Sequence, residues 1–383
     1  MVRTPYSKLD SDAFTRIRVI LMTAIEADAL RFSHMCGRMN GALRPELAQI
    51  RRLEQHQRTL VNWLNPADQT PLETSIAYEQ VAIEVTAAVA LAEPDAYAAA
   101  TYRFGLLEDF DHMYRYSALM DRVEGKDANA IIQSYTDIMP GRATSVQHRH
   151  PYDDVRDHYD KDRAEFITKL HALTIVSGES QTHEYYLNVG PKFADPIARQ
   201  LYAEIASVEE QHVTQFESLT DPRETWMEKW MLHKAMEVYN YWSCVESEED
   251  PKIKRIWERS LDYKLGQLQH VAALFERYER RDASSILPDS LPDPIQYVSH
   301  REYIKQVLRA EQGLSAKRPD YVDRSQEHPR TVEYRRQLES EGSASDTIAA
   351  DYNWTAGTEL SAIPAGQVEL PVTMADETIR RTL

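Results

Sequence analysis

Two short segments pair a carboxylate with an imidazole three residues further along the chain. Glu209 is followed by His212, and Asp109 is followed by His112. On a helix, residues three apart lie on the same face, about one turn from each other. Carboxylate and imidazole groups together suit Fe and Mn as ligands. Both segments are therefore candidate metal-binding motifs, although helix phase alone does not separate Asp109 from its neighbour Glu108.

Further carboxylates lie on the apolar faces of expected helices. Glu54 shares a stripe with Leu47 and Ile50, and Glu26 and Glu84 are likewise flanked by apolar residues. An ionised carboxylate inside a helix bundle is costly unless it is paired or bound to metal. Several carboxylates in one layer would also repel each other. Bound cations remove both problems, so the pattern predicts metal binding.

The chain contains an internal repeat. Residues 48–57 can be laid over 203–212, residues 82–85 over 235–238, and residues 109–112 over 267–270. Each match is short, but the three occur in the same order and at similar separations. We therefore expect a duplicated unit.

The spacing of polar residues about the expected turns places them at common heights. In an antiparallel helix pair, two residues equally far from the connecting turn lie side by side. Four pairs meet this condition, each about 12 to 15 residues from its turn, or roughly 18–23 Å along the helix. The pairs are Glu26 with Glu54, Glu84 with Asp109, Glu179 with Glu209, and Glu237 with Gln267.

Apolar residues recur at intervals of three and four, which predicts an all-α protein. Breaks at Gly and Pro delimit helices at about 12–39, 45–64, 71–92, 96–123, 161–189, 195–219, 222–249 and 251–281. Short connections favour two tandem four-helix bundles, at residues 11–125 and 161–283, with a linker at 126–160. Residues 284–383 are expected to form an extended tail that wraps the bundles or a partner, with one possible short helix at about 300–314.

This arrangement resembles the ferritin-like di-iron carboxylate family, in which two helices each supply a Glu and two others each supply Glu-x-x-His. In the C-terminal half, the resemblance assigns Glu179, Glu209, His212, Glu237, Gln267 and His270 as metal ligands, with Gln267 replacing a carboxylate. In the N-terminal half, it assigns Glu26, Glu54, Glu84, Asp109 and His112, with Gln57 where a His is expected. Glu184 competes weakly with Glu179. Both sets depart from the family pattern, so the number of metals per bundle stays open.

The resemblance implies an oxidoreductase that uses Fe, or an Fe/Mn pair, to activate dioxygen or peroxide toward an unknown small molecule. Two alternatives stay open: an iron oxidation and storage protein, and a non-catalytic helical scaffold with residual polar layers. Several aromatic residues lie near the expected layer of polar groups. We expect them to be ordinary core residues and not a redox relay or hydrogen-bond donors to a ligand. They are Tyr185, Tyr186, Tyr239, Tyr241, Trp242 and Tyr263.

The composition limits which classes of binding partner and which cellular compartment are expected. A net charge of −17 over 383 residues argues against nucleic acid or an anionic membrane as the main partner. Cys36 and Cys244 fit no metal or redox motif and are expected to be buried free thiols. The N-terminal residues and the lack of a long uninterrupted apolar run favour a cytoplasmic protein. His148, His150 and His158 favour an exposed polar linker over a cation site, and the tail could mediate a homodimer or bind a partner protein.

Overall fold

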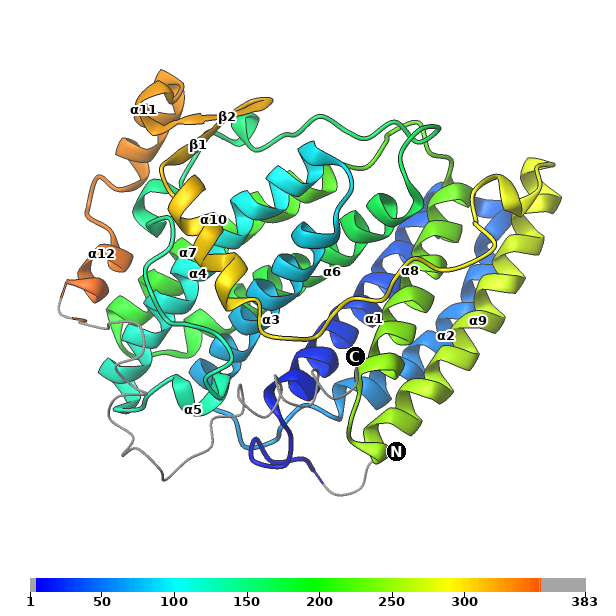
Figure 1. Cartoon of the computed structure of the whole chain (residues 1–383), viewed down its shortest axis with the longest axis horizontal. Helices are drawn as coiled ribbons and strands as arrows, with labels where there is room; N and C mark the ends of the chain where they lie inside the picture. The colour runs from blue at the N-terminus through cyan, green and yellow to red at the C-terminus, as the bar shows by residue number, and fades with distance from the viewer. Residues whose placement is uncertain (1–4, 351, 353–383) are drawn as a thin grey trace.

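A computed structural model describes residues 5–350 and residue 352, and within them the fold is all-α, as the apolar periodicity predicts. Eight long helices dominate the described chain (Figure 1). They are α1 (Ala13–Met39), α2 (Arg44–Asn62), α3 (Pro71–Ala92), α4 (Ala96–Glu124), α6 (Phe166–Val189), α7 (Pro196–Glu217), α8 (Trp226–Ser247) and α9 (Pro251–Glu279). Their bounds follow the expected breaks, except that α6 and α8 begin four or five residues later.

Capping side chains explain several helix starts. Thr70 and Thr225 each form a capping box at the beginnings of α3 and α8. Asp95 and Asp250 each accept two backbone N–H bonds at the starts of α4 and α9. The box at Thr225 is the reason that α8 begins there and not at Pro222.

Consecutive helices pair, but the pairs combine across the two halves of the chain. Helices α3 and α4 pack with α6 and α7 to form bundle A, where His212 Nδ1 of α7 lies 3.1 Å from Asp109 Oδ1 of α4. Helices α1 and α2 pack with α8 and α9 to form bundle B, where Lys264 Nζ of α9 lies 2.9 Å from Glu26 Oε1 of α1. In Figure 1 bundle B occupies the right side. This pairing differs from the expected separate bundles at residues 11–125 and 161–283.

Helix α1 joins the two bundles. Every residue from Ala13 to Glu26 is buried, so this part of α1 has no solvent face. It contacts α8 within bundle B and also α3 and α6 of bundle A. A helix that is buried all round belongs between layers and not at the edge of one bundle. One continuous apolar core therefore runs through both bundles.

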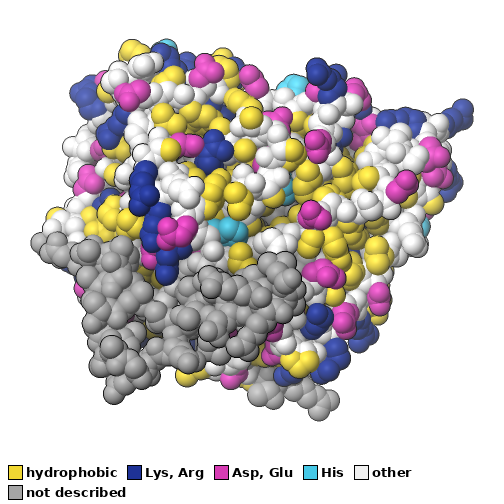
Figure 2. Space-filling model, in the orientation of Figure 1, with side chains coloured by type: hydrophobic (Ala, Val, Ile, Leu, Met, Phe, Trp, Pro, Cys, Tyr) yellow, Lys and Arg dark blue, Asp and Glu magenta, His cyan; other side chains and the backbone are white. Residues whose placement is uncertain are grey.

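Helix α3 is long and apolar enough to cross a membrane by length and composition alone. However, 78% of its most apolar window is buried inside the protein, between α1, α4 and α6. Its composition is that of a core helix. On the face seen in Figure 1, acidic and basic side chains are interspersed with apolar ones (Figure 2). Cys36 and Cys244 are buried free thiols, as expected, and burial raises the pKa of Cys36 to about 11.

The expected linker forms short elements against bundle A. They are α5 (Asn129–Ile132) and two single 3-10 turns, Thr144–Val146 and Pro151–Asp153. Its polar residues are largely buried, which corrects the expectation of an exposed linker. His148 is 4% exposed, while His158 lies on the surface as expected.

The described part of the C-terminal segment crosses bundle A. It contains α10 (Arg301–Glu311), β1 (Leu314–Lys317), β2 (Asp320–Asp323), α11 (Pro329–Leu338) and α12 (Ala344–Ala349), with β1 and β2 antiparallel. Helix α10 confirms the short helix expected at about 300–314. Arg103 of α4 pairs with Glu311 at 2.6 Å, and Arg115 donates to the Ser345 carbonyl oxygen at 2.8 Å. The remainder of the expected tail, from residue 353 onward, lies outside the described residues.

Candidate metal centre

Six metal-ligating side chains meet in the middle of bundle A. Two overlapping groups occur, and within each the ligand atoms all lie within 4.8 Å of one another. The first group is Glu79, Asp109, His112 and Glu209, and the second is Asp109, Glu179, Glu209 and His212. All six side chains are buried. Asp109 and Glu209 belong to both groups, so the two groups form one cluster, and each group could hold a metal ion.

Each helix of bundle A contributes to this cluster. Helices α4 and α7 each supply a carboxylate and an imidazole from positions three apart, which face the same way. Helices α3 and α6 each supply one carboxylate, Glu79 and Glu179. Four carboxylates and two imidazoles therefore converge from four helices, and three ligands come from each half of the chain.

The two imidazole rings are oriented by hydrogen bonds on their far side. His112 Nε2 donates to Gln147 Oε1 at 2.9 Å, and His212 Nε2 donates to Glu108 Oε2 at 2.9 Å. The opposite nitrogen of each ring faces the cluster, with His112 Nδ1 2.9 Å from Glu209 Oε1. A fixed outer partner of this kind sets both the tautomer and the angle of a metal-binding histidine.

The linker completes this outer layer with buried ion pairs. Glu108 pairs with Arg149 and lies 3.3 Å from Arg142, and Arg149 also pairs with Asp154 at 2.5 Å. Burial disfavours the charge on Glu108, but Arg149, His212 and Arg142 together hold its pKa below its usual range. Glu108 is thus an ionised partner of His212, while its neighbour Asp109 faces the cluster. The sequence did not show whether Glu108 or Asp109 is the candidate ligand. In the structure Asp109 belongs to the cluster, and Glu108 contacts His212 from outside it.

Burial and mutual repulsion oppose the charges inside the cluster. Burial, followed by the neighbouring carboxylates, raises the pKa of Glu79 well above its usual value. Burial, followed by Asp109, raises that of Glu179 in the same way. Burial favours the neutral form of His212, but the surrounding carboxylates raise its pKa well above the usual value. The cluster therefore attracts positive charge strongly, whether protons or metal ions supply it.

Several ligand atoms of the cluster form no hydrogen bond within the described structure. Within the described residues, both Asp109 carboxylate oxygens, one oxygen each of Glu79, Glu179 and Glu209, and His212 Nδ1 are buried without a hydrogen-bond partner. Buried polar atoms normally have partners, because leaving one unsatisfied costs about 1–3 kcal/mol. Six such atoms in one cluster are available as metal ligands, and His212 Nδ1 already lies 3.1 Å from Asp109 Oδ1 and 3.4 Å from Glu209 Oε2.

The structure brings together Asp109, His112, Glu179, Glu209 and His212, but it separates the other predicted ligands from them. Glu84 accepts bonds from Thr136 Oγ1 at 2.7 Å and from the His300 N–H at 3.0 Å, so it anchors the C-terminal segment. Glu79 takes the expected place of Glu84. The sequence did contain the signal, because Glu79 and Asp109 are centred on Pro94, in the turn between α3 and α4.

The remaining predicted ligands belong to bundle B. Glu26, Glu54, Glu237 and Gln267 are buried there beside two lysines, Lys234 and Lys264. His270 does not join them.

Helix phase explains the position of His270. It lies six residues after Lys264, or roughly 240° around the helix axis. Its side chain is 45% exposed and pairs with Glu46 at 3.1 Å. Glu184, the weaker alternative to Glu179, pairs with Arg31 at the surface.

One of the aromatic residues contacts the cluster directly. Tyr186 donates to Glu79 Oε1 at 2.5 Å and is buried. In bundle B, Tyr241 donates to Glu26 at 2.6 Å. Tyr185 and Tyr239 bond to backbone oxygens, and Tyr263 is 46% exposed.

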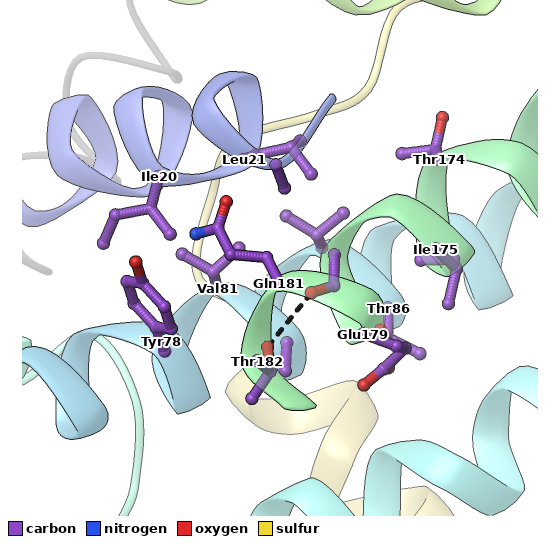
Figure 3. Close-up of a pocket in the computed structure, with 14 residues that line it drawn as sticks. Ile20, Leu21, Tyr78, Val81, Thr86, Thr174, Ile175, Glu179, Gln181 and Thr182 are labelled. Carbon is purple, nitrogen blue, oxygen red and sulfur yellow. Dashed lines mark hydrogen bonds between the residues drawn. The ribbon is translucent and has the colours of Figure 1, made fainter. Parts of the chain in front are cut away.

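A small cavity adjoins the cluster on the side of α6. It lies between α1, α3 and α6, and Glu179 forms part of its lining beside Ile175 and Thr182 (Figure 3). Its space is about 360 Å³ including the part open to solvent, of which about 20 Å³ can hold the centre of a water-sized molecule. One water needs roughly 10–15 Å³ by that measure. The cavity therefore has room for one or two small molecules next to Glu179.

Comparisons with protein-family models, with curated proteins and with solved structures found no match to this chain.

Proposed function

We propose that this protein is a two-metal oxidoreductase of the ferritin-like di-iron carboxylate type. It binds Fe, or an Fe/Mn pair, in bundle A and activates dioxygen or peroxide to oxidise a small molecule. The observation that supports this proposal is the cluster of six buried ligands from four helices. Six of its ligand atoms have no hydrogen-bond partner among the described residues.

The charges of the ligands match two divalent cations. Glu79, Asp109, Glu179 and Glu209 together carry four negative charges when ionised, and the two imidazoles bind metals as neutral rings. Two divalent ions neutralise this set inside the low-dielectric core. Glu79 and His112 would hold one ion, Glu179 and His212 the other, and Asp109 and Glu209 both. Redox-active ions held there supply electrons to the oxidant.

The protein groups around the centre have separate roles. Gln147 and Glu108 hold the rings of His112 and His212, so that Nδ1 of each points to the metals. Tyr186 positions Glu79 and can pass a proton to it along their 2.5 Å hydrogen bond. The cavity beside Glu179 has room for a diatomic oxidant next to the centre.

The size of this cavity favours a second candidate function, oxidation of Fe(II) itself. An organic substrate of aromatic size needs more room than the cavity offers, whereas a metal ion and dioxygen do not. Iron oxidation would use the same ligands, with Fe(II) as the substrate.

Metal content tests the proposal. Protein grown with abundant iron and manganese and purified without chelators is expected to hold close to two metal ions per chain. The double variant Glu209→Ala, His212→Ala is expected to lose them, because it removes a shared ligand and an imidazole. Glu210→Ala is the matched control, since Glu210 is an exposed carboxylate on the same helix. Fewer than about 0.2 metal ions per chain in the unaltered protein would refute the proposal and leave a scaffold role.

Oxygen consumption then separates the chemical roles. Adding Fe(II) to metal-depleted protein in the presence of dioxygen is expected to cause rapid oxygen uptake, which the double variant lacks. Uptake that continues over many equivalents of Fe(II) identifies iron oxidation. Uptake limited to about one oxygen per centre identifies an oxidase or oxygenase that needs another substrate. Bound metal with no uptake would indicate a structural centre.

A further inference from the structure

The two halves of the chain are equivalent in detail. The capping boxes begin at Thr70 and Thr225, and the next helices are capped by Asp95 and Asp250. The difference in residue number between equivalent positions of the two halves, called the step below, is 155 both from Thr70 to Thr225 and from Asp95 to Asp250. The step is also 155 where residues 48–57 match residues 203–212. The capping residues correct the other two matches expected from the sequence, 82–85 with 235–238 and 109–112 with 267–270, whose steps are two residues too short and three too long. In α1 and α6 the step is 153, since the connections differ slightly in length.

Contacts between the halves repeat with the same steps. Thr168 of α6 donates to Glu93 at the end of α3, at 2.6 Å. Thr15 of α1 donates to Glu248 at the end of α8, at 2.8 Å. Each half therefore lends its first helix pair to the second pair of the other half. Bundles A and B are therefore equivalent to each other, with the same differences in residue number between matching positions.

This equivalence matches every ligand of the centre to a residue of bundle B. The matching pairs are Glu79 and Lys234, Asp109 and Lys264, His112 and Gln267, Glu179 and Glu26, Glu209 and Glu54, and His212 and Gln57. Two carboxylates are retained, two are replaced by lysine, and both imidazoles are replaced by glutamine. The exchanges fall on the positions that bind the metals.

The two lysines are buried among carboxylates. Lys264 Nζ lies 2.9 Å from Glu26 Oε1 and 2.7 Å from Glu237 Oε2. Lys234 Nζ lies 2.6 Å from Glu237 Oε1 and also pairs with Glu54. Lys264 is fully buried, and Lys234 is 2% exposed. Gln267 Nε2 donates to Gln57 Oε1 at 3.0 Å, which ties the two imidazole-equivalent positions together.

We infer that bundle B is a metal-free counterpart of the centre, in which the ammonium groups of Lys234 and Lys264 take the place of the two cations. This inference deepens the proposed function and rests on it, since it limits the metal ions to one pair per chain. The two ammonium groups are linked covalently to their helices, so they offset two of the three charges that Glu26, Glu54 and Glu237 can carry without being taken up from solution. A glutamine amide is also a much poorer metal ligand than an imidazole.

The fixed cations have a structural consequence for the centre. Helix α1 supplies Ile20, Leu21 and Ala24 to the wall of the cavity beside Glu179 (Figure 3). Lys264 links α1 to α9 from within bundle B. Bundle B therefore holds this wall in place whether or not bundle A contains metal. The same charge network keeps the Lys264 amine protonated, because Glu237 and Glu26 raise its pKa against the effect of burial.

Co(II) titration of the metal-depleted full-length chain tests the inference. Visible absorption and metal analysis give the number of ions bound. The unaltered chain is expected to bind two. A variant of bundle A, Asp109→Asn with Glu209→Gln, is expected to bind none. A fourfold variant of bundle B, Gln57→His, Lys234→Glu, Lys264→Asp and Gln267→His, is expected to bind four, because it restores all six ligands of the second cluster.

The outcomes separate the inference from the function on which it rests. No Co(II) bound by the unaltered chain refutes the proposed function. Four ions bound by the unaltered chain overturn the inference alone. Two ions retained by the bundle A variant overturn both the inference and the placement of the metals in bundle A. A folded fourfold variant that still binds two ions also overturns it.

A variant with fewer exchanges covers the case in which the fourfold variant does not fold. Lys234→Glu with Lys264→Asp, in the bundle A variant, adds two carboxylates and removes two ammonium groups. Its thermal midpoint is expected to rise on addition of Co(II), whereas that of the bundle A variant alone is expected to stay constant. If neither midpoint responds, or both do, the inference is wrong.

Discussion

The substitution Glu108→Gln tests whether the buried ion pairs behind the centre support metal binding. Glu108 touches no metal position, but its Oε2 accepts the hydrogen bond that orients His212, at 2.9 Å. It also neutralises Arg149 and faces Arg142 at 3.3 Å. Glutamine has nearly the same shape, so the substitution removes charge and leaves little cavity.

Two losses are expected from this substitution, and they differ in size. Altering an outer partner of a metal-binding histidine typically weakens metal binding about 10- to 100-fold, or roughly 1.4–2.8 kcal/mol. Glutamine can still accept from His212 Nε2, as Gln147 does from His112, so only the charge is lost and we expect the lower end, about 10-fold. Removing one member of a buried ion pair typically costs about 3–5 kcal/mol of folding free energy. Arg149 keeps Asp154 at 2.5 Å, so we expect the lower end, about 3 kcal/mol.

The assay measures the two losses separately. Co(II) affinity is measured by competition with a chelator of known affinity, and stability by urea unfolding of the metal-depleted protein. Glu210→Gln, on the exposed face of α7, is the matched control and is expected to change neither quantity. A folded Glu108→Gln protein whose Co(II) affinity stays within about twofold of the unaltered protein would refute the argument, because the negative charge behind His212 would then not contribute to metal binding.

Three further predictions concern single residues. Burial, with help from Arg149, lowers the pKa of His148 to about 4, so the folded chain keeps this ring neutral while the unfolded chain protonates it below its usual pKa of 6.5. Stability should therefore fall by about 2 kcal/mol from pH 7 to pH 5, and urea unfolding of His148→Gln should show a flatter pH dependence. Gly141→Ala would place a Cβ 2.2 Å from the Leu107 carbonyl oxygen, and unfolding should become easier by about 1–3 kcal/mol; an unchanged urea midpoint would contradict this packing. Tyr186→Phe removes the hydroxyl that bonds Glu79 and should slow Fe(II)-dependent oxygen uptake while leaving two metals bound; an unchanged rate would remove Tyr186 from proton transfer.

The fold class, the helix bounds and five of the six cluster ligands could be predicted from the sequence. Periodicity and turn residues report local structure, and the spacing of Asp109 with His112 and of Glu209 with His212 is itself local. Glu79 was missed because α3 is buried on most sides, so Glu84, roughly 140° further around the helix, also lies among apolar residues. The symmetric distance from the turn at Pro94 distinguishes them, since Glu79 satisfies it better.

The pairing of the halves could not be predicted from the repeat. The first helix pair of each half can pack against the second pair of its own half or of the other half. An apolar stripe shows that a helix face is buried, but it does not identify the helix that covers it. The continuous burial of α1 from Ala13 to Glu26 shows that it faces both bundles. The burial of Arg149 and Lys264 could not be predicted either, because arginine and lysine are usually exposed. Their burial depends on carboxylates that are distant in sequence.

The exchange of helix pairs also determines the order in which the protein can assemble. Helices α1 and α2 leave the ribosome first, yet their partners α8 and α9 are synthesised last. Bundle A has all its helices once residue 217 has emerged, whereas bundle B needs residue 279. At roughly 5–20 residues per second, the first two helices wait on the order of ten seconds or more for their partners. During this wait the apolar faces of α1 and α2 that pack against α8 and α9 are exposed. The nascent chain therefore needs protection from aggregation until α8 and α9 have been synthesised and complete bundle B.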